Sequence, residues 1–313
     1  MVDRMGKQTL GAAGQRTPRR IRRKWQLYLL ILPAIVSIFI FHYIPIYGVQ
    51  IAFKNFRSSK GILGSEWVGF KHFARFLAYP DFWKILWNTV RISLYALATF
   101  PCPVILALMM NELNSERYKK FMQMVTFAPH FISTVVVCSM VLLFFDRSQG
   151  LVNNVIAALG GERYDFVSST RYFSSLYVWS GVWQNLGWNA IIYIAALSSV
   201  SPELIEAARV DGATRLQIVR YVNFPAILPT VITMLILSAG SLLNVGFEKI
   251  YLLQNPLNME ASRVISTYVY EIGLQGGQFS YSTAIGLFNN VVNIVVIILV
   301  NGISKRVTRV ALW

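Results

Sequence analysis

Charged residues are scarce in this chain of 313 residues. They make up 14% of it, whereas a soluble domain carries about 25%. A soluble protein with so few charges could not cover its own apolar surface, because hydrophobic residues account for 55% of the chain and the mean hydropathy is +0.50. The same composition excludes disordered and fibrous proteins. A membrane protein is the class that this composition predicts.

Cysteine and acidic residues are also few. The two cysteines, Cys102 and Cys138, both lie in apolar runs, which argues against a disulfide framework and against a thiolate metal site. Asp and Glu number 14 against 29 Lys and Arg, so the net charge is +15. Such a charge could indicate a nucleic acid partner, and the positions of the basic residues must decide.

Six apolar runs are long enough to cross a membrane as helices, which takes about 20 residues each. They cover residues 25–53, 88–110, 121–145, 172–197, 227–243 and 284–303. The first run is too long for a signal-peptide core, and no small-residue cleavage site follows it, so we expect it to be retained. The predicted organisation is a basic N-terminal tail (1–24), a six-span domain (25–303) and a C-terminal tail (304–313).

Basic residues predict the orientation of these spans. More of them fall on the side of the two termini, and the cluster Arg16–Lys24 borders the first span, which favours cytoplasmic N- and C-termini. Beside a membrane this cluster is a topology signal, or more sharply a site for anionic lipid, so the charge needs no nucleic acid. The residues before it lack periodicity and predict a disordered tail. Arg91, about one turn into the second span, is expected to extend to the interface rather than bind an acidic sugar.

The loop between the fourth and fifth spans, residues 201–225, contains sequence signals that predict its local structure. Ser201 can cap a helix that begins at Pro202. Gly212 offers a left-handed stop after Asp211. Thr214 and Gln217 have the spacing of a capping box for a second short helix, which we expect to end before Pro225.

This loop could rest on the membrane surface or dock on another protein. Ala207 and Ala208 make a poor membrane anchor, and the charges of Glu206, Arg209 and Asp211 leave no wide apolar stripe. Small residues beside a charge better suit insertion into a groove of a partner. Docking is therefore the favoured interpretation.

Glu206-Ala207-Ala208, then Gly212, then Val222-Asn223-Phe224-Pro225 resembles the EAA motif of permease subunits of ATP-binding-cassette (ABC) importers. The spacing matches throughout, with Val222 and Phe224 as apolar replacements for Ile and Leu. The segments 41–56, 67–90 and 249–270 are similar to the subgroup that imports complex oligosaccharides. The likeness covers roughly residues 27–305.

The resemblance implies an all-α membrane protein with six transmembrane helices and the type I ABC importer permease (MetI-like) fold. It implies a second and different permease subunit, two cytoplasmic ATPases and an extracellular or periplasmic solute-binding protein, in the bacterial cytoplasmic membrane. ATP and magnesium would be bound by the ATPase and no cofactor by this chain. The residues that the resemblance assigns to ATPase coupling are Glu206, Ala207, Ala208, Asp211, Gly212 and Pro225.

Motifs that would give the chain its own chemistry are absent from the sequence. It has no G-x-x-x-x-G-K-[ST] nucleotide loop, no H-E-x-x-H zinc motif and no G-x-S-x-G nucleophile turn. The histidines His42, His72 and His130 are scattered, so we expect no metal site and no catalytic residue. The span interiors also lack Asp and Glu, the usual proton or sodium relays. Energy must come from a partner chain or, as an alternative, from an ion gradient.

Polar and aromatic side chains in the spans are candidates for the sugar path. Trp179 and Trp183 share one helix face by their spacing, as do Asn185 and Asn189. Aromatic rings stack on the apolar faces of sugars, and amides exchange hydrogen bonds with hydroxyls; packing between helices is the alternative role. Further candidates are Asn289 and Asn293 in the last span, with Thr230, Thr233, Ser238, Ser241 and Asn244 in the fifth.

The favoured function is therefore the permease subunit of an ATP-driven importer of an oligosaccharide or similar carbohydrate, working by alternating access. Two alternatives remain from the sequence: a gradient-driven carrier, and a membrane scaffold whose EAA-like loop docks a partner that is not an ATPase.

Overall fold

The computed structural model describes residues 25–308 and 310–312. The predicted disordered tail and the basic cluster Arg16–Lys24 lie outside the described residues. The chain divides into two units, with the boundary after Gln50, and each unit is described by itself.

The first unit is an apolar helical run. Helix α2 (Trp25–Ile38) continues through a π-helical turn η1 (Phe39–Tyr43), a short helix α3 (Ile44–Ile46) and the 3-10 segment η2 (Tyr47–Phe53), which crosses the boundary. Pro33 lies inside α2, and the helix continues through it. The helical run Gln26–Phe53 has 28 residues and contains an 18-residue window with a mean hydropathy of 2.3, so it is long and apolar enough for a span, as predicted.

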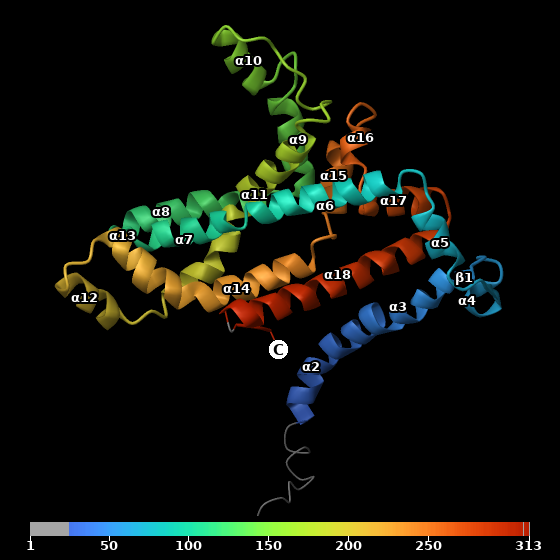
Figure 1. Cartoon of the computed structure of the whole chain (residues 1–313), viewed down its shortest axis with the longest axis horizontal. Coiled ribbons are helices and arrows are strands. Elements are labelled where there is room, and N and C mark those ends of the chain that lie inside the picture. The colour runs from blue at the N-terminus through green and yellow to red at the C-terminus, as the bar shows by residue number, and fades with distance from the viewer. Residues whose placement is uncertain (1–24, 309, 313) are drawn as a thin grey trace, which may run out of the picture. The chain divides into compact units, whose positions relative to one another are not determined.

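In the second unit, three helical stretches meet the same criteria of length and composition. They are Phe82–Asn111, formed by α6 (Phe82–Ala98) and α7 (Pro101–Asn111); Arg215–Gly240, formed by α13 (Arg215–Ile218), η4 (Val219–Asn223) and α14 (Phe224–Gly240); and α18 (Phe279–Thr308). They contain the second, fifth and sixth predicted runs, apart from the last three residues of the fifth. Helices α14 and α18 lie side by side (Figure 1).

The third predicted run, residues 121–145, is not one straight helix. Helix α8 (Glu116–Phe127) and the 3-10 turn η3 (Ala128–Phe131) meet α9 (Thr134–Phe144) at an angle of 98°. The bend has a local cause: Pro129 ends the first helix, and Ser133 caps the next, its hydroxyl accepting a hydrogen bond from the Val136 amide at 3.4 Å. Hydropathy does not register this bend, because the run stays apolar across it.

The fourth run forms α11 (Phe173–Leu197), which meets α12 (Pro202–Val210) at 77°. Counting each bent pair as one span gives up to six candidate spans among the described residues, and leaving the bent pairs out gives four. The predicted all-α membrane protein is confirmed as a mostly helical one. The exception is a two-stranded antiparallel ribbon of β1 (Lys54–Asn55) and β2 (Glu66–Trp67).

Short helices connect the long ones. They are α4 (Gly61–Gly64), α5 (Lys71–Leu77), α10 (Leu151–Ala158), α15 (Phe247–Leu253), α16 (Met259–Ser262), α17 (Ile265–Tyr270) and the π-helical η5 (Glu271–Gln275). Helix α10 projects away from the long helices of the second unit (Figure 1).

Helix α11 is central to the second unit. Ala190, Tyr193 and Leu197 pack with Ala107 of α7 and Ile227 of α14 in one buried apolar cluster. The small side chains of Ala107 and Ala190 are fully buried and permit close approach of the backbones, as is usual between membrane helices. Polar side chains on the other faces of α11 are thereby held in fixed directions.

Candidate functional site

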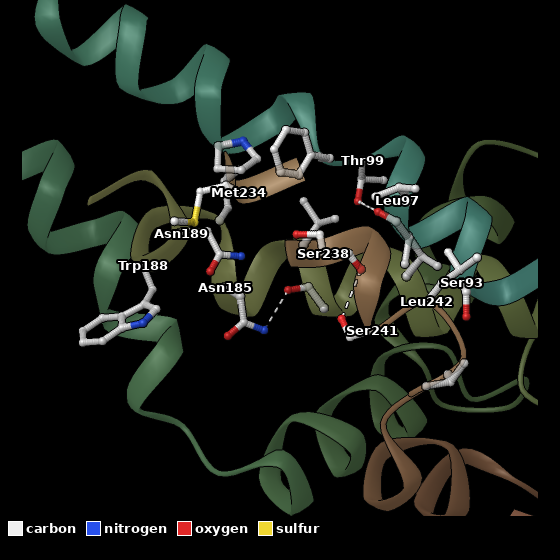
Figure 2. Close-up of a pocket in the computed structure, with 18 of the residues that line it drawn as sticks. Ser93, Leu97, Thr99, Asn185, Trp188, Asn189, Met234, Ser238, Ser241 and Leu242 are labelled. Atoms are coloured by element: carbon white, nitrogen blue, oxygen red, sulfur yellow. Dashed lines mark hydrogen bonds between the residues drawn. The ribbon is translucent and has the colours of Figure 1, made fainter. Parts of the chain in front are cut away.

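A cavity of about 620 Å³ lies between α6, α7, α11, α14 and the segment after α14 (Figure 2). Its polar lining includes Ser93, Thr99, Asn185, Asn189, Ser238, Ser241 and Asn244. Trp188, Leu97, Met234 and Leu242 are among its apolar residues. Of the described residues that line it, none carries a formal charge. Such a wall can form hydrogen bonds with hydroxyls and stack against sugar rings.

Asn185 and Asn189 both face this cavity, so the helix face predicted from their spacing is correct. The Asn185 amide is held in place: Nδ2 donates to the Gly181 carbonyl at 3.1 Å, and Oδ1 lies 3.0 Å from Nδ1 of His130. The His130 ring in turn stacks on Trp188, with centroids 4.2 Å apart. The exposed Asn189 side chain has no hydrogen-bond partner among the described residues, so its donors and acceptor are free for a ligand.

Asn289 and Asn293 do not line the cavity but position a residue that does. Both donate from Nδ2 to Oδ1 of Asn244, at 2.9 and 3.0 Å. Asn293 Oδ1 also accepts from the Leu243 amide at 3.0 Å, which ties α18 to the segment after α14. The predicted shared face of the two asparagines is confirmed, and Asn244 is the amide that they present to the cavity.

Trp179 and Trp183 line a different cavity of about 500 Å³, which is mostly apolar. Its other residues include Val137, Phe144 and Tyr172. Trp179 Nε1 donates to the Tyr95 hydroxyl at 2.9 Å. The structure therefore separates this tryptophan pair from the asparagine pair, although all four residues lie on α11.

The sequence did not indicate Ser93, Thr99 and Trp188, which line the cavity, or His130, which contacts Asn185 and Trp188 without lining it. Trp188 follows Asn185 by three residues on α11, and this helical spacing could have indicated it. His130 lies in η3, and no local signal connects it with α11. Among the other polar candidates, Ser238 and Ser241 line the cavity, whereas the Thr233 hydroxyl donates to the Pro229 carbonyl of its own helix at 2.8 Å.

Arg91 does not simply extend away from the protein. Its guanidinium lies 3.5 Å from the Ala261 carbonyl, and Nε is buried without a hydrogen-bond partner among the described residues. The side chain contributes to packing between α6 and α16.

The loop with the EAA-like motif has the predicted helix start and glycine turn. Helix α12 begins at Pro202 after Ser201, although the Ser201 side chain makes no capping hydrogen bond. Gly212 has φ +80°, and the Ala213 and Gly212 amides donate to the carbonyls of Ala208 and Arg209 at 2.9 and 3.0 Å. This is a complete Schellman motif, so the predicted left-handed stop is confirmed.

The capping box after this glycine is also confirmed. The Thr214 hydroxyl accepts from the Gln217 amide at 3.4 Å, and Gln217 Oε1 accepts from the Thr214 amide at 2.7 Å. The loop is thus a helix, a glycine turn and the start of a second helix.

The surface of this loop is open. Glu206, Ala207 and Asp211 are exposed, and Ala208 is half-buried. Large aliphatic side chains are exposed beside them, with Leu204 58%, Val210 88% and Leu216 77% accessible. Apolar side chains mixed with charges and alanines form a surface suited to a protein partner.

The second helix of the loop does not end before Pro225, contrary to the expectation. It runs through the π-helical turn η4 into α14, and Pro225 lies in the first turn of α14. The π turn shifts the hydrogen bonding to i→i−5, as in the Phe224 amide bond to the Val219 carbonyl, and so accommodates a residue without an N–H.

Asn223, in the same turn, is 1% exposed. Its Nδ2 donates to Glu112 Oε1 at 3.1 Å, at the end of α7. The loop is therefore anchored to a second long helix, by a contact 111 residues apart that no sequence spacing reveals.

Residues 100–309 match the family described as binding-protein-dependent transport system inner membrane component. The polygalacturonan/rhamnogalacturonan transport system permease protein YteP of Bacillus subtilis (strain 168) is 42% identical over 287 residues, which cover 91% of this chain and 89% of YteP. Protein LplB of the same organism is 42% identical over 293 residues, with coverages of 93% and 92%.

A solved structure has the same fold. A chain in the crystal structure of a bacterial alginate ABC transporter, in complex with an alginate pentasaccharide-bound periplasmic protein, is 39% identical with a TM-score of 0.86. The match covers 95% of this chain and 100% of that one.

The chain belongs to the family of binding-protein-dependent inner membrane transport components. It is a multi-pass membrane permease of the ABC importer class and not an enzyme, because ATP hydrolysis in this class takes place on a separate subunit. The resemblance carried by the EAA-like motif is confirmed.

Proposed function

We propose that this chain, a permease of a carbohydrate ABC importer, translocates an oligosaccharide of an acidic polysaccharide across the bacterial cytoplasmic membrane. The observation that carries the proposal is the similarity, over nine-tenths of the chain, to permeases named for polygalacturonan/rhamnogalacturonan and found in an alginate transporter. The amide- and hydroxyl-lined cavity supports it, because its wall suits the hydroxyls and rings of a sugar.

The proposed partners are a solute-binding protein, two ATPases and a second permease subunit. A solute-binding protein delivers the sugar, in line with the periplasmic protein bound in the alginate transporter structure. Two cytoplasmic ATPases provide the energy, and a second, different permease subunit completes the pathway. The exposed helix α12 and its Schellman turn support its role as the coupling helix, with Glu206, Ala207, Ala208, Asp211, Gly212 and Pro225 in the coupling segment.

The mechanism is alternating access. Closure of the ATPase dimer moves α12, and the contact between Asn223 and Glu112 passes the movement on to α7, which with α11 and α14 encloses the cavity. The sugar meets Asn189 and Asn244 there, and Trp188 offers a ring for stacking.

Reconstitution tests this function directly. The purified permease pair, ATPase and binding protein are placed in proteoliposomes, and uptake of radiolabelled oligogalacturonides and alginate oligomers is measured. ATP-dependent uptake that requires the binding protein is expected. Uptake driven by a proton or sodium gradient without the ATPase would contradict the proposal.

The orientation gives a first prediction. If the termini and the 201–225 loop are cytoplasmic, a single cysteine at exposed position 60 should react with an impermeant maleimide on intact cells, and one at exposed position 215 should not. Both are introduced in a background that lacks Cys102 and Cys138. Labelling at 215 but not at 60 would reverse the orientation, and permeabilised cells provide the control in which both sites react.

The sugar path gives a second prediction. Asn189→Ala should lower the rate of uptake about tenfold, because a buried hydrogen bond to a sugar hydroxyl contributes on the order of 1–1.5 kcal/mol. Assembly of the complex and basal ATPase activity should stay at the parental level, because the Asn189 side chain makes no hydrogen bond among the described residues.

Trp183→Ala is the companion variant, because Trp183 lines the second cavity on the same helix. Sugar uptake by the Trp183→Ala variant should stay near the parental rate. An equal loss in both variants would place the second cavity on the pathway, and no loss with Asn189→Ala would remove Asn189 from it.

A further inference from the structure

Lys249, in α15, is a buried ammonium group without a counter-ion. The residue is 9% exposed, and Nζ has no hydrogen-bond partner among the residues that the structure describes. No described carboxylate lies within 4.0 Å of it, since the ion pairs found join Lys84 to Glu260 and Arg263 to Glu271. Its favourable contact is with the ring of Tyr177, whose centroid lies 5.2 Å from Nζ.

Burying an unpaired charge is costly, and such groups in membrane proteins usually serve a function. Burial lowers the pKa of Lys249 to about 8, and the nearby Cys138 opposes this effect. At neutral pH the amine therefore stays mostly protonated, and burial of its charge lowers the stability of the folded protein.

The position of this charge connects it with the cavity. Nζ stands directly behind Gly181, so that a Cβ at Gly181 would lie 3.2 Å from it. Gly181 itself lines the cavity, and its carbonyl holds the amide of Asn185. Gly181 thus lies between the ammonium and the cavity, and it has no side chain that would keep the two apart. The field of a charge at this position extends into the cavity.

We propose that Lys249 is a specificity-determining residue of the sugar path: its charge, acting through the gap at Gly181, favours a sugar that carries a carboxylate. The inference rests on the proposed function and identifies the group that recognises the carboxylate of the sugar. A cavity without charged lining residues would otherwise treat a uronic acid and its neutral ester alike. Lys249 provides the discrimination between the acid and its neutral ester that the lining residues lack.

The test compares two sugars of equal length, trigalacturonate and its fully methyl-esterified, neutral form. Uptake is measured in phosphatidylcholine proteoliposomes with the complete importer and the parental binding protein, so that anionic lipid is absent. Each variant is divided by the parent for the same sugar, which cancels the preference of the binding protein. Lys249→Met should lower uptake of trigalacturonate about tenfold and leave uptake of the ester within about twofold.

Lys84→Met is the matched control, since Lys84 is an exposed lysine whose partner is the surface carboxylate Glu260. The Lys84→Met variant should leave the uptake of both sugars unchanged. An equal fall in the uptake of both sugars in Lys249→Met would assign Lys249 a structural role. Unchanged uptake of both sugars would exclude any role of Lys249 in transport. Either result overturns the inference while the proposed function stands. If Lys249→Met does not assemble, Lys249→Gln should give the same selective loss, because glutamine removes the charge and keeps a polar group at the end of the side chain.

The parental importer separates the inference from the proposed function. A parent that transports neither sugar, or the ester alone, contradicts the proposed acidic substrate itself, and the inference falls with it. A parent that transports the acid alone is tested with Lys249→Arg, which keeps the charge and should retain uptake where Lys249→Met loses it. Loss of uptake in both would overturn the role of the charge.

Discussion

Glu206→Ala and Gly212→Val are expected to abolish coupling between ATP hydrolysis and uptake while the spans remain inserted. Glu206 is exposed on α12 beside Ala207, so a basic group of the ATPase can reach it. Truncating one member of such a partly desolvated ion pair costs about 2–5 kcal/mol. Co-purification of the ATPase and the ratio of sugar imported to ATP hydrolysed are the measurements, and both should fall at least tenfold.

At Gly212 the expected loss has a different cause. The residue has φ +80°, and a Cβ there would have no neighbour within 4 Å, so the strain of a substitution comes from the backbone alone. A β-branched residue in this conformation costs on the order of 1–3 kcal/mol, and the chain is expected to escape by breaking the Schellman turn. Helix α12 would then lose its angle to the second helix.

Two matched variants separate coupling from simple damage to the loop. Glu203→Ala removes an exposed carboxylate from the same helix, outside the motif, and should retain transport. Gly212→Asn should also retain much of it, because asparagine tolerates the left-handed region. If Glu206→Ala and Gly212→Val both transport at the parental rate with normal retention of the ATPase, α12 is not the coupling helix.

The features that the sequence predicted correctly have local causes. The long apolar runs depend on composition within about 20 residues, and the glycine turn and the capping box depend on two or three neighbouring side chains. Gly212, Thr214 and Gln217 therefore behave as expected.

The bend at Pro129–Ser133 carried the same kind of local signal, a proline followed by a capping serine. An apolar window hides such a signal. A run that satisfies hydropathy can thus contain two helices.

The sugar path was predicted less completely, because helical spacing shows which residues share a face but not what that face meets. Helix α11 contacts other elements on several sides, so Asn185 and Asn189 face one cavity and Trp179 and Trp183 another. His130, Lys249 and the Glu112 carboxylate reach their partners through contacts between distant segments. Such contacts follow from packing, which a single sequence does not display.

Close packing of α11 against the bend at Pro129–Ser133 predicts a large loss of stability when Gly187 is substituted. Gly187 is buried on α11, and a Cβ added there would collide with the backbone carbonyl of Thr126 and with the ring of Phe127. Nearby on the same helix, Gln184 donates to the Ile132 carbonyl at 2.9 Å, which fixes α11 against the turn. Gly187→Ala is expected to cost about 1–3 kcal/mol by overpacking, and Gly187→Val more. Because Asn185, Trp188 and His130 are positioned by this contact, transport should be lost together with stability.

The measurement is the thermal unfolding of the purified complex, followed together with the yield of assembled permease. Gly286→Ala is the control: Gly286 is also a helical glycine, on α18, but a Cβ there has no neighbour within 4 Å. Alanine is favoured over glycine in a helix by roughly 0.5–1 kcal/mol, so this variant should unfold at the same or a higher temperature. Opposite shifts for the two glycines would establish the close approach of α11 to α8. Equal shifts, or a Gly187→Val variant as stable as the parent, would show that α11 and the bend are not packed as the structure has them.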